Sequence, residues 1–586
     1  MRMVMVMVPV MLRTNVHYTQ NYPHGLSLSI ILRPPPHIAR LQYGRFAAAM
    51  RTPITALPIL LLFSALLPAS QLAAQQPSFP HLEKRGVTTQ LIVDGQPFLM
   101  LSGELYNSSS SSLEYMQPQW ARLAAMSLNT VLTPISWELV EPTEGHFDFT
   151  LIDGLLAQAR QQHMHIVFLW LASWKNGMSS YPPVWVKQDS KRFPRVIVNG
   201  NPIGILSTLA PATRDADAHA FAAVMQHLRQ VDAQDHTVLM MQVENEVGVL
   251  GDTRDHSPEA NRAFASAVPA DLLQYLQSHV ESLDPDLRAL WFQNGRKTSG
   301  TWAQVFGDTS RADEIFMAWN YARFIQTVTA QGKAAYNLPM YVNTWLAGPS
   351  AIPGVFPSGG PEPRVIDVWK AAGSAIDIFA PDLYSPDLAS WTTQYHRNGN
   401  PLFLPETNGG AAGAANVFYA LGEHAAIGFS PFAIDSATSA STELGDSYAL
   451  LTTLTPLLLQ HQAAGDIHGF VLDKSHPSVE FTLNGYILHV SLDELFGNHT
   501  EKGFGIIMAD GPDHFLGAGK GFHVSFALRY PATAHVGIAS IDEGKFVAGK
   551  WIPGRRLNGD ESDQGNYWRV DQGELHTEKV AVYQFQ

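Results

Sequence analysis

Residues 238–248 read Val238-Leu-Met-Met-Gln-Val-Glu244-Asn245-Glu246-Val-Gly248, an apolar run that ends in two carboxylates and an amide. A buried strand that presents acids at its tip is typical of barrel enzymes, whose catalytic groups lie at the carboxyl ends of parallel strands. The alternative is a surface strand whose end happens to be charged. Residues 402–408 repeat the pattern, because an apolar strand ends there in Glu406. Two carboxylates on separate strand tips of one barrel are what hydrolysis of a glycosidic bond requires.

Strands and helices alternate around these two segments. Residues 149–163, for example, carry apolar side chains at helical spacing between two predicted strands. Alternation of this kind predicts a parallel sheet, and a count of eight strands favours a closed (β/α)8 barrel over a doubly wound sheet. The two acids then fall at the ends of strands four and seven. The predicted strands are 98–104, 129–138, 165–171, 238–246, 339–345, 376–384, 401–406 and 426–432.

The pattern changes near residue 463, where short strands separated by Gly, Asp and Asn turns begin. This pattern predicts a smaller all-β, sandwich-like domain that packs against the barrel. We therefore expect a catalytic barrel over residues 84–462 and the β domain over residues 463–586. The long Pro-, Gly- and Ser-rich stretch 175–210 is expected to be a loop over the active end of the barrel.

Residues 50–74 have the features of a secretory signal. Arg51 is the basic start, 57–67 form the apolar region, and Leu72-Ala73-Ala74 resembles a cleavage site. We expect residues 1–49, which precede this signal, to be a mis-assigned upstream extension. The protein is accordingly expected to be periplasmic or secreted by a bacterium, with no membrane association after the signal is cleaved.

Composition excludes several classes of protein. The 586 residues include no cysteine, which rules out disulfides, thiolate metal sites and cysteine nucleophiles. The formal charge is −14, from 38 Lys and Arg against 52 Asp and Glu, so nucleic acid is not an expected partner. His163 and His165 have a possible metal spacing but no third ligand at a usual interval, so we expect no metal and no cofactor.

Alternation along a strand places Glu244 and Glu246 on the same side, so periodicity does not choose between them. Glu246 lies nearer the carboxyl end of the strand, where barrels have their catalytic groups, and is predicted to be the general acid/base. Glu244 is expected to be a buried orienting carboxylate that needs a partner. Glu406 is predicted to be the nucleophile of a retaining reaction. Retention requires the two carboxyls to be roughly 5–5.5 Å apart, whereas a gap of about 6.5–9.5 Å would indicate inversion.

Further polar and aromatic groups stand near the predicted strand tips. Aromatic rings can stack on sugar faces and carboxylates accept hydrogen bonds from sugar hydroxyls, although core packing is the alternative for any single Trp. The candidate substrate-binding residues of this kind are Glu104, Trp137, Glu138, Trp174, Trp345 and Tyr384.

Together these segments resemble glycoside hydrolase family 35, the β-galactosidases, in its bacterial branch with a C-terminal β domain. The resemblance rests on Ser102-Gly103, Asn129-Thr-Val, the stretch 137–149, Gln242-Val-Glu-Asn-Glu-Val-Gly248 and Pro405-Glu406. The usual S-G-x-x-H-Y segment of that family stands here as Ser-Gly-Glu-Leu-Tyr-Asn.

The resemblance implies a retaining mechanism with Glu246 as acid/base and Glu406 as nucleophile. It also implies that Asn245 contacts the sugar 2-hydroxyl and that Tyr384 holds the nucleophile. The predicted function is an exo-acting β-galactosidase that removes terminal β-galactose from plant-derived oligosaccharides or polysaccharides. Two alternatives stay open: another retaining β-glycosidase, such as an arabinosidase or fucosidase, and a barrel that binds carbohydrate without catalysis.

Overall fold

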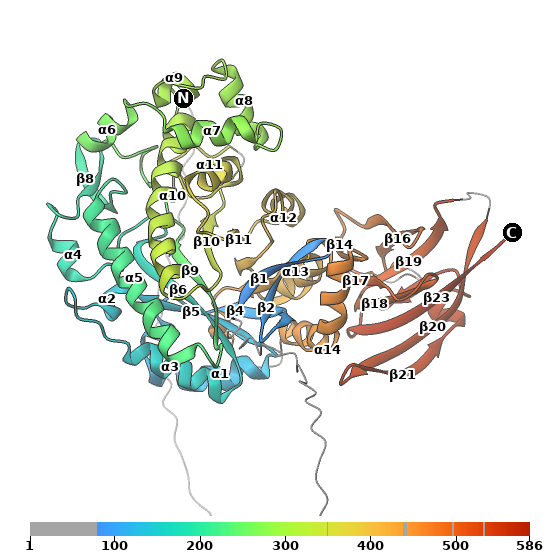
Figure 1. Ribbon diagram of the computed structural model, residues 1–586. Helices are drawn as coiled ribbons and strands as arrows, with labels where there is room; N and C mark the ends of the chain where they lie inside the picture. The colour runs from blue at the N-terminus through green and yellow to red at the C-terminus, as the bar shows by residue number, and fades with distance from the viewer. Residues whose placement is uncertain (1–78, 349, 438–441, 495–496, 498, 531–533) are drawn as a thin grey trace, which may run out of the picture. The chain divides into compact units, whose positions relative to one another are not determined.

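The computed structural model describes residues 79–348, 350–437, 442–494, 497, 499–530 and 534–586. The predicted upstream extension and the predicted signal segment lie outside these residues. Eight parallel strands close into a barrel surrounded by helices (Figure 1), which confirms the predicted (β/α)8 fold. The strands, in chain order, are β4 (Met100–Glu104), β5 (Thr130–Ser136), β6 (His165–Lys175), β9 (Val238–Asn245), β10 (Met340–Trp345), β11 (Ile378–Leu383), β12 (Leu404–Thr407) and β13 (Gly428–Pro431).

The barrel strands are apolar on both faces because both faces are covered. Every residue of β9 is buried, as expected for a parallel strand with side chains on one face and helices on the other. Side chains such as Leu132, Leu169, Tyr341 and Phe403 fill the interior, so the barrel is a packed core.

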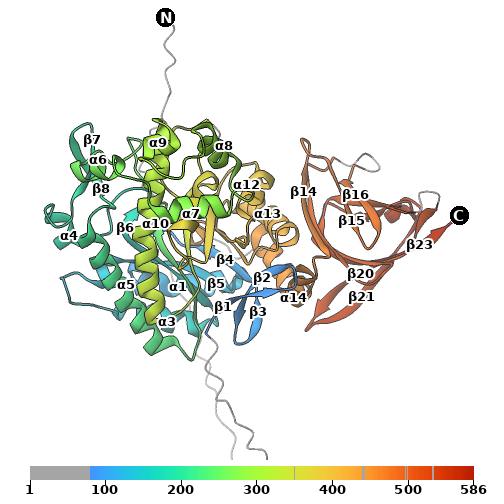
Figure 2. The ribbon, with the colours of Figure 1, turned by 45° about the horizontal axis from the view of Figure 1, so that its top comes forward.

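Helices cover the outside of the barrel. Two of the longest, α5 (Pro211–Asp232) and α10 (Ser310–Ala335), lie side by side (Figure 2). A Cβ atom at Gly332 would come within 2.3 Å of the Phe221 ring, so the glycine permits this close approach. The other helices are α1 (Leu113–Ala125), α2 (Trp137–Val140), α3 (Thr150–Gln161), α4 (Val184–Gln188), α6 (Pro258–Phe264), α7 (Ala270–Ser278), α8 (Pro285–Gln293), α9 (Trp302–Phe306), α11 (Ile366–Ala372), α12 (Leu388–Tyr395), α13 (Gly410–Glu423) and α14 (Glu443–Ala464).

A small antiparallel sheet precedes the barrel, made of β1 (His81–Arg85), β2 (Thr88–Val93) and β3 (Gln96–Phe98). Asp94 and Gly95 form the turn between β2 and β3, with φ of 51° and 74°, the positive values that a two-residue hairpin favours. Leu91 and Val93 belong to the same apolar cluster as the barrel interior. The hairpin therefore closes one end of the barrel and leaves the other for the site.

The C-terminal part consists of two antiparallel sheets with an apolar core between them, as predicted. A Cβ atom at Gly422 of α13 would lie 2.6 Å from the backbone of Gly469, and the rings of Phe418 and Phe504 are 5.1 Å apart, so α13 packs directly on the larger sheet. The larger sheet contains β14 (Ile467–Asp473), β17 (Lys502–Ala509), β18 (His514–Lys520), β23 (His576–Phe585), β20 (His535–Val547) and β21 (Lys550–Leu557), and the smaller contains β15 (Ser478–Leu483), β16 (Tyr486–Leu492), β19 (Phe522–Leu528) and β22 (Trp568–Val570).

Within the part of the chain that the structure describes, the helices are too short or too polar for any of them to cross a bilayer.

Candidate active site

Three carboxyl groups meet at the carboxyl ends of three barrel strands. Glu246 directly follows β9, Asp382 is on β11 and Glu406 is on β12. One oxygen from each group lies within 4.8 Å of the others, and all three residues are at least nine-tenths buried. The predicted pair is therefore brought together, and a third acid joins it.

Glu246 is held in an unusual backbone conformation. Its φ of 45° is in the left-handed region, where a non-glycine residue is strained and needs support from its surroundings. The backbone N–H donates to Asn343 Oδ1 at 3.0 Å, and Asn176 Nδ2 donates to Glu246 Oε2. Burial, followed by the charge of Glu406, raises the pKa of Glu246 to about 7. This carboxyl can thus carry a proton near neutral pH.

Glu406 accepts a hydrogen bond from a neighbouring phenol. Tyr384 Oη donates to Glu406 Oε1 at 2.6 Å, while Oε2 has no hydrogen-bond partner among the described residues. Burial and then the charge of Glu406 raise the pKa of Tyr384, so the phenol stays protonated. The expected contact between Tyr384 and Glu406 is therefore present.

Glu104 and Asn245 are buried beside these acids, with 1% of each residue exposed. Both carboxylate oxygens of Glu104 and both amide atoms of Asn245 lack partners among the described residues. Burial, then the charge of Glu406, raises the pKa of Glu104 well above its usual range, and Lys175 opposes the shift. Buried polar groups without partners cost about 1–3 kcal/mol each, so these atoms are free to bind sugar hydroxyls or water.

A pocket of about 390 Å³ opens above the carboxyl cluster, within the usual size range of small-molecule sites. Trp345 and Tyr384 line it and each keeps 42% of its surface exposed, so their rings are accessible to a ligand. Trp391 of α12 and Asn176 also line the pocket, and the sequence patterns did not single out either. Asn176 directly follows β6, but this strand runs to Lys175, beyond the end at residue 171 that the sequence pattern predicted, and Trp391 lies on a helix.

Trp137, Trp174 and Glu138 do not reach the pocket, which corrects the prediction that they bind substrate. Trp137 and Trp174 have no exposed surface: the first packs against Trp185, and the second against Tyr321 and Phe324. Fully buried rings offer no face to a sugar. Glu138 instead forms an ion pair with Lys187 at 3.0 Å.

Glu244 is buried and has the partners that its position requires. Its two oxygens accept the backbone N–H groups of Ser173 and Trp174, at 3.0 and 2.8 Å, and its carboxyl shares a hydrogen bond with Asp217 of α5. Burial, then the charge of Asp217, raises the pKa of Glu244. This residue therefore fastens the end of β6 to β9 and orients the segment that carries Asn176.

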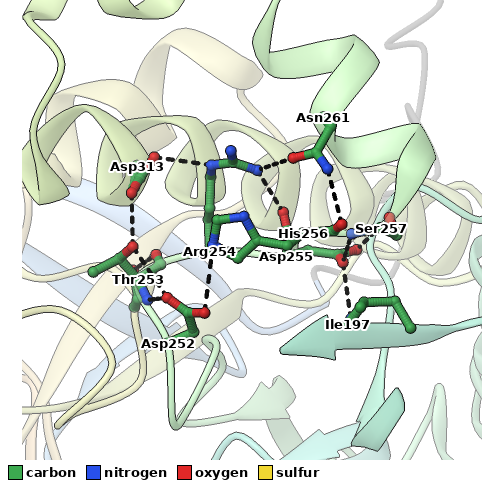
Figure 3. Close-up of polar contacts among 10 residues, drawn as sticks. Ile197, Asp252, Thr253, Arg254, Asp255, His256, Ser257, Asn261 and Asp313 are labelled. Carbon is green, nitrogen blue, oxygen red and sulfur yellow. Dashed lines mark hydrogen bonds and ion pairs between the residues drawn. The ribbon is translucent and has the colours of Figure 1, made fainter. Parts of the chain in front are cut away.

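The loop after Glu246 is fixed by a polar network around the buried Asp255 (Figure 3). Asp255 accepts hydrogen bonds from the backbone of Ile197 at 3.1 Å and from the hydroxyl of Ser207 at 2.6 Å. Arg254 donates to Asp313 at 3.0 Å. A Cβ atom at Gly248 would lie 2.3 Å from the Pro357 backbone, so only glycine fits where the chain leaves the site.

The carboxyl oxygens of the three acids are suited to a hard divalent cation, but such ions take about six oxygen ligands. Oxygens on all three acids already accept hydrogen bonds, from Asn176, Asn343 and Tyr384. Proton transfer fits this arrangement better than metal binding. A (β/α)8 barrel with paired carboxyls, one of them protonated near neutral pH, has the fold and the groups of a glycoside hydrolase.

Comparisons with known proteins agree with this class. The family model of glycoside hydrolase family 42, described as β-galactosidase, matches residues 105–325, and a domain of unknown function (DUF5597) matches residues 444–569. A β-galactosidase of Xanthomonas manihotis is 27% identical over 214 residues, 36% of this chain and 33% of that protein. The chain thus matches about a third of the length of this relative.

Solved structures include the β-galactosidases of Rahnella sp. R3 and of Bacillus circulans sp. alkalophilus. They are 18% and 14% identical, with TM-scores of 0.42 and 0.41; the matches cover 63% and 62% of this chain and 57% of each of the other chains. The family-model match is to family 42, which corrects the resemblance to family 35, while the likeness to β-galactosidase glycoside hydrolases stands.

Proposed function

We propose that the chain is a retaining, exo-acting β-galactosidase in which Glu246 is the acid/base and Glu406 the nucleophile. The observation that carries the proposal is the carboxyl pair itself. An oxygen of Glu246 lies within 4.8 Å of an oxygen of Glu406, and of these two acids Glu406 is the one that accepts a hydrogen bond from the Tyr384 phenol. So short a separation favours retention, because inversion needs room for a water between the carboxyls. The matches to β-galactosidases support galactose as the sugar.

In this mechanism Glu406 attacks the anomeric carbon while Glu246 gives its proton to the departing oxygen. Glu246 then accepts a proton from water, which releases the sugar from Glu406. A pKa of about 7 suits both tasks of Glu246. Glu104 and Asn245 would accept hydrogen bonds from sugar hydroxyls and donate hydrogen bonds to them, and Trp345 would stack on a sugar face.

Azide rescue tests the two roles separately, with a dinitrophenyl β-galactoside as substrate. Glu246→Ala should form the glycosyl-enzyme but turn it over slowly, and azide should restore turnover with a β-galactosyl azide as product. For Glu406→Gly, azide should occupy the space of the lost nucleophile and give the α product. Exchanged products would reverse the two roles, and the absence of any rescue would contradict the double displacement.

The sugar is tested with a panel of aryl β-glycosides on the native enzyme. Galactoside should have the highest kcat/KM; a higher value for arabinoside or fucoside would replace galactose in the proposal. Absence of hydrolysis, together with binding of galactose in calorimetry, would instead indicate a carbohydrate-binding barrel.

We also infer export, from the basic start, apolar stretch and small-residue site of residues 50–74. Expression in a Gram-negative host followed by N-terminal sequencing of the periplasmic protein tests this. The mature chain should begin after Ala74; a mature protein that retains Tyr43 would contradict it.

A further inference from the structure

We propose that Asp382 is a third carboxyl of the site, a protonated positioning residue that donates a hydrogen bond to Glu246 in both halves of the reaction. The proposal rests on the function proposed above, because it assigns Asp382 a task only if Glu246 transfers protons. No sequence pattern pointed to Asp382, although it stands at the tip of the sixth barrel strand, two residues before Tyr384.

The three acids lie so close together that they cannot all be ionised at once. Asp382 is 3% exposed, and one of its oxygens lies within 4.8 Å of an oxygen of Glu246 and of Glu406. Two like charges at about 4–5 Å repel by roughly 3–4 kcal/mol at the effective dielectric of a protein site. Three ionised carboxylates would therefore be strongly unfavourable. Since Glu406 must be ionised to attack, the protons belong on Glu246 and Asp382.

Asn343 decides which oxygen of Asp382 carries the proton. Its Oδ1 accepts the Glu246 backbone N–H at 3.0 Å, so its other end, Nδ2, must donate, and it donates to Asp382 Oδ2 at 2.8 Å. Asp382 Oδ2 is thus the accepting oxygen. Asp382 Oδ1 has no partner among the described residues, so as O–H it needs an acceptor, and the Glu246 carboxyl supplies one.

The charged surroundings support a neutral Asp382. Burial, then the charges of Glu406 and Glu246, raises the pKa of Asp382 well above its usual range. The hydrogen bond from Asp382 in turn lowers the pKa of Glu246, against the larger effects of burial and of Glu406. The titratable groups around the two acids are Glu104 of β4, Lys175 of β6, Tyr341 of β10, Tyr384, Tyr395 of α12 and Glu406 of β12.

The proton of Asp382 is never transferred. In the first half-reaction the bond from the anomeric carbon to the leaving oxygen breaks, the bond to Glu406 forms, and the proton of Glu246 moves to the leaving oxygen. Glu246 is then a carboxylate that the Asp382 O–H stabilises. In the second half-reaction water attacks the anomeric carbon, the bond to Glu406 breaks, and Glu246 takes a proton of the water. Asp382 thus keeps Glu246 from becoming too weak an acid.

Two substitutions by residues of similar size distinguish the effect of the hydrogen bond that Asp382 donates from the effect of a negative charge on Asp382. Asp382→Asn retains an N–H donor, and Asp382→Leu retains the volume without one. We expect kcat/KM of Asp382→Asn to stay within about fivefold of native, with the basic limb of its pH profile unmoved. For Asp382→Leu we expect a fall in kcat of about tenfold or more and a basic limb moved to higher pH, because Glu246 loses the donor that lowers its pKa.

An infrared difference spectrum gives a measurement that does not depend on turnover. Native protein minus Asp382→Asn at pH 7 should show the carbonyl band of a protonated carboxyl, lost in the variant. A carboxylate band in its place, or a basic limb of Asp382→Asn moved to lower pH, would mean that Asp382 is ionised and would overturn the proposal. Unchanged kinetics in Asp382→Leu would also overturn it. If no glycoside is hydrolysed but the protonated band is present, the proposed function fails while the proton on Asp382 stands.

Discussion

Tyr384 Oη lies 2.6 Å from Glu406 Oε1, and the two residues end neighbouring strands of the barrel. Asp382 and Glu406 are paired in the ladder between β11 and β12, so the strand register itself brings the phenol to the carboxylate. We predict that Tyr384→Phe lowers kcat by about 10²- to 10³-fold, the usual effect of losing one preorganised donor. Steady-state kinetics with an aryl galactoside measures this. A loss below threefold would show that the hydrogen bond does not assist Glu406.

The pKa of Glu246, about 7, predicts the basic limb of the pH profile. The first half-reaction requires the protonated form, so kcat/KM should fall as pH rises through about 7. Glu406→Gln removes a charge that raises this pKa, so Glu246 should titrate at lower pH in that variant. Carbon NMR of labelled Glu carboxyls follows the titration, with Glu246→Gln to assign the signal. An equal pKa in native and Glu406→Gln proteins would contradict the coupling.

Two tryptophans distinguish binding from stability. Trp345→Ala should raise KM about two- to tenfold, the equivalent of roughly 0.5–1.5 kcal/mol for a stacking contact, and leave the melting temperature unchanged. Trp174→Ala removes a fully buried ring and should lower the free energy of unfolding by about 3–5 kcal/mol. Kinetics and denaturant unfolding of both variants test this contrast. Loss of stability in Trp345→Ala would place that ring in the core instead.

The C-terminal domain contains a buried acid whose titration should appear in stability. Glu578 accepts a hydrogen bond from Trp568 Nε1 at 2.7 Å, and burial is the main cause that raises its pKa to about 8. The pKa of Glu578 is higher in the folded protein than in the unfolded chain. The stability that protonated Glu578 contributes is therefore complete below about pH 4.5 and is lost as pH rises through about 8. Between these values Glu578 should cost about 1.4 kcal/mol of stability per pH unit.

Glu578→Gln should remove that slope while retaining an acceptor for Trp568. Urea unfolding from pH 5 to 8, followed by tryptophan fluorescence, measures how the free energy of unfolding changes with pH. Glu574→Gln, at an exposed position four residues earlier, is the matched control and should leave the slope as it is. The same slope in Glu578→Gln and native protein would mean that Glu578 is not the group responsible.

The barrel could be predicted from the amino-acid sequence, because each strand and helix has its own apolar period and a local period needs no knowledge of distant contacts. The count of eight strands followed, as did the placement of Glu246 and Glu406 at the tips of strands four and seven. The structure separates the two acids of strand four, since Glu246 lines the pocket while Glu244 binds backbone N–H groups behind it.

Which residues near the strand tips face the pocket depends on tertiary contacts that the sequence patterns do not show. Trp174 and Trp345 both follow apolar runs, yet the first ring is buried against helix α10 and the second is exposed, because the direction of a side chain at a strand end depends on what packs there. Asp382 and Asn343 come from strands far apart in sequence from Glu246 and meet it only when the barrel closes. Their contact depends on strand register around the ring, which no local pattern in the chain encodes.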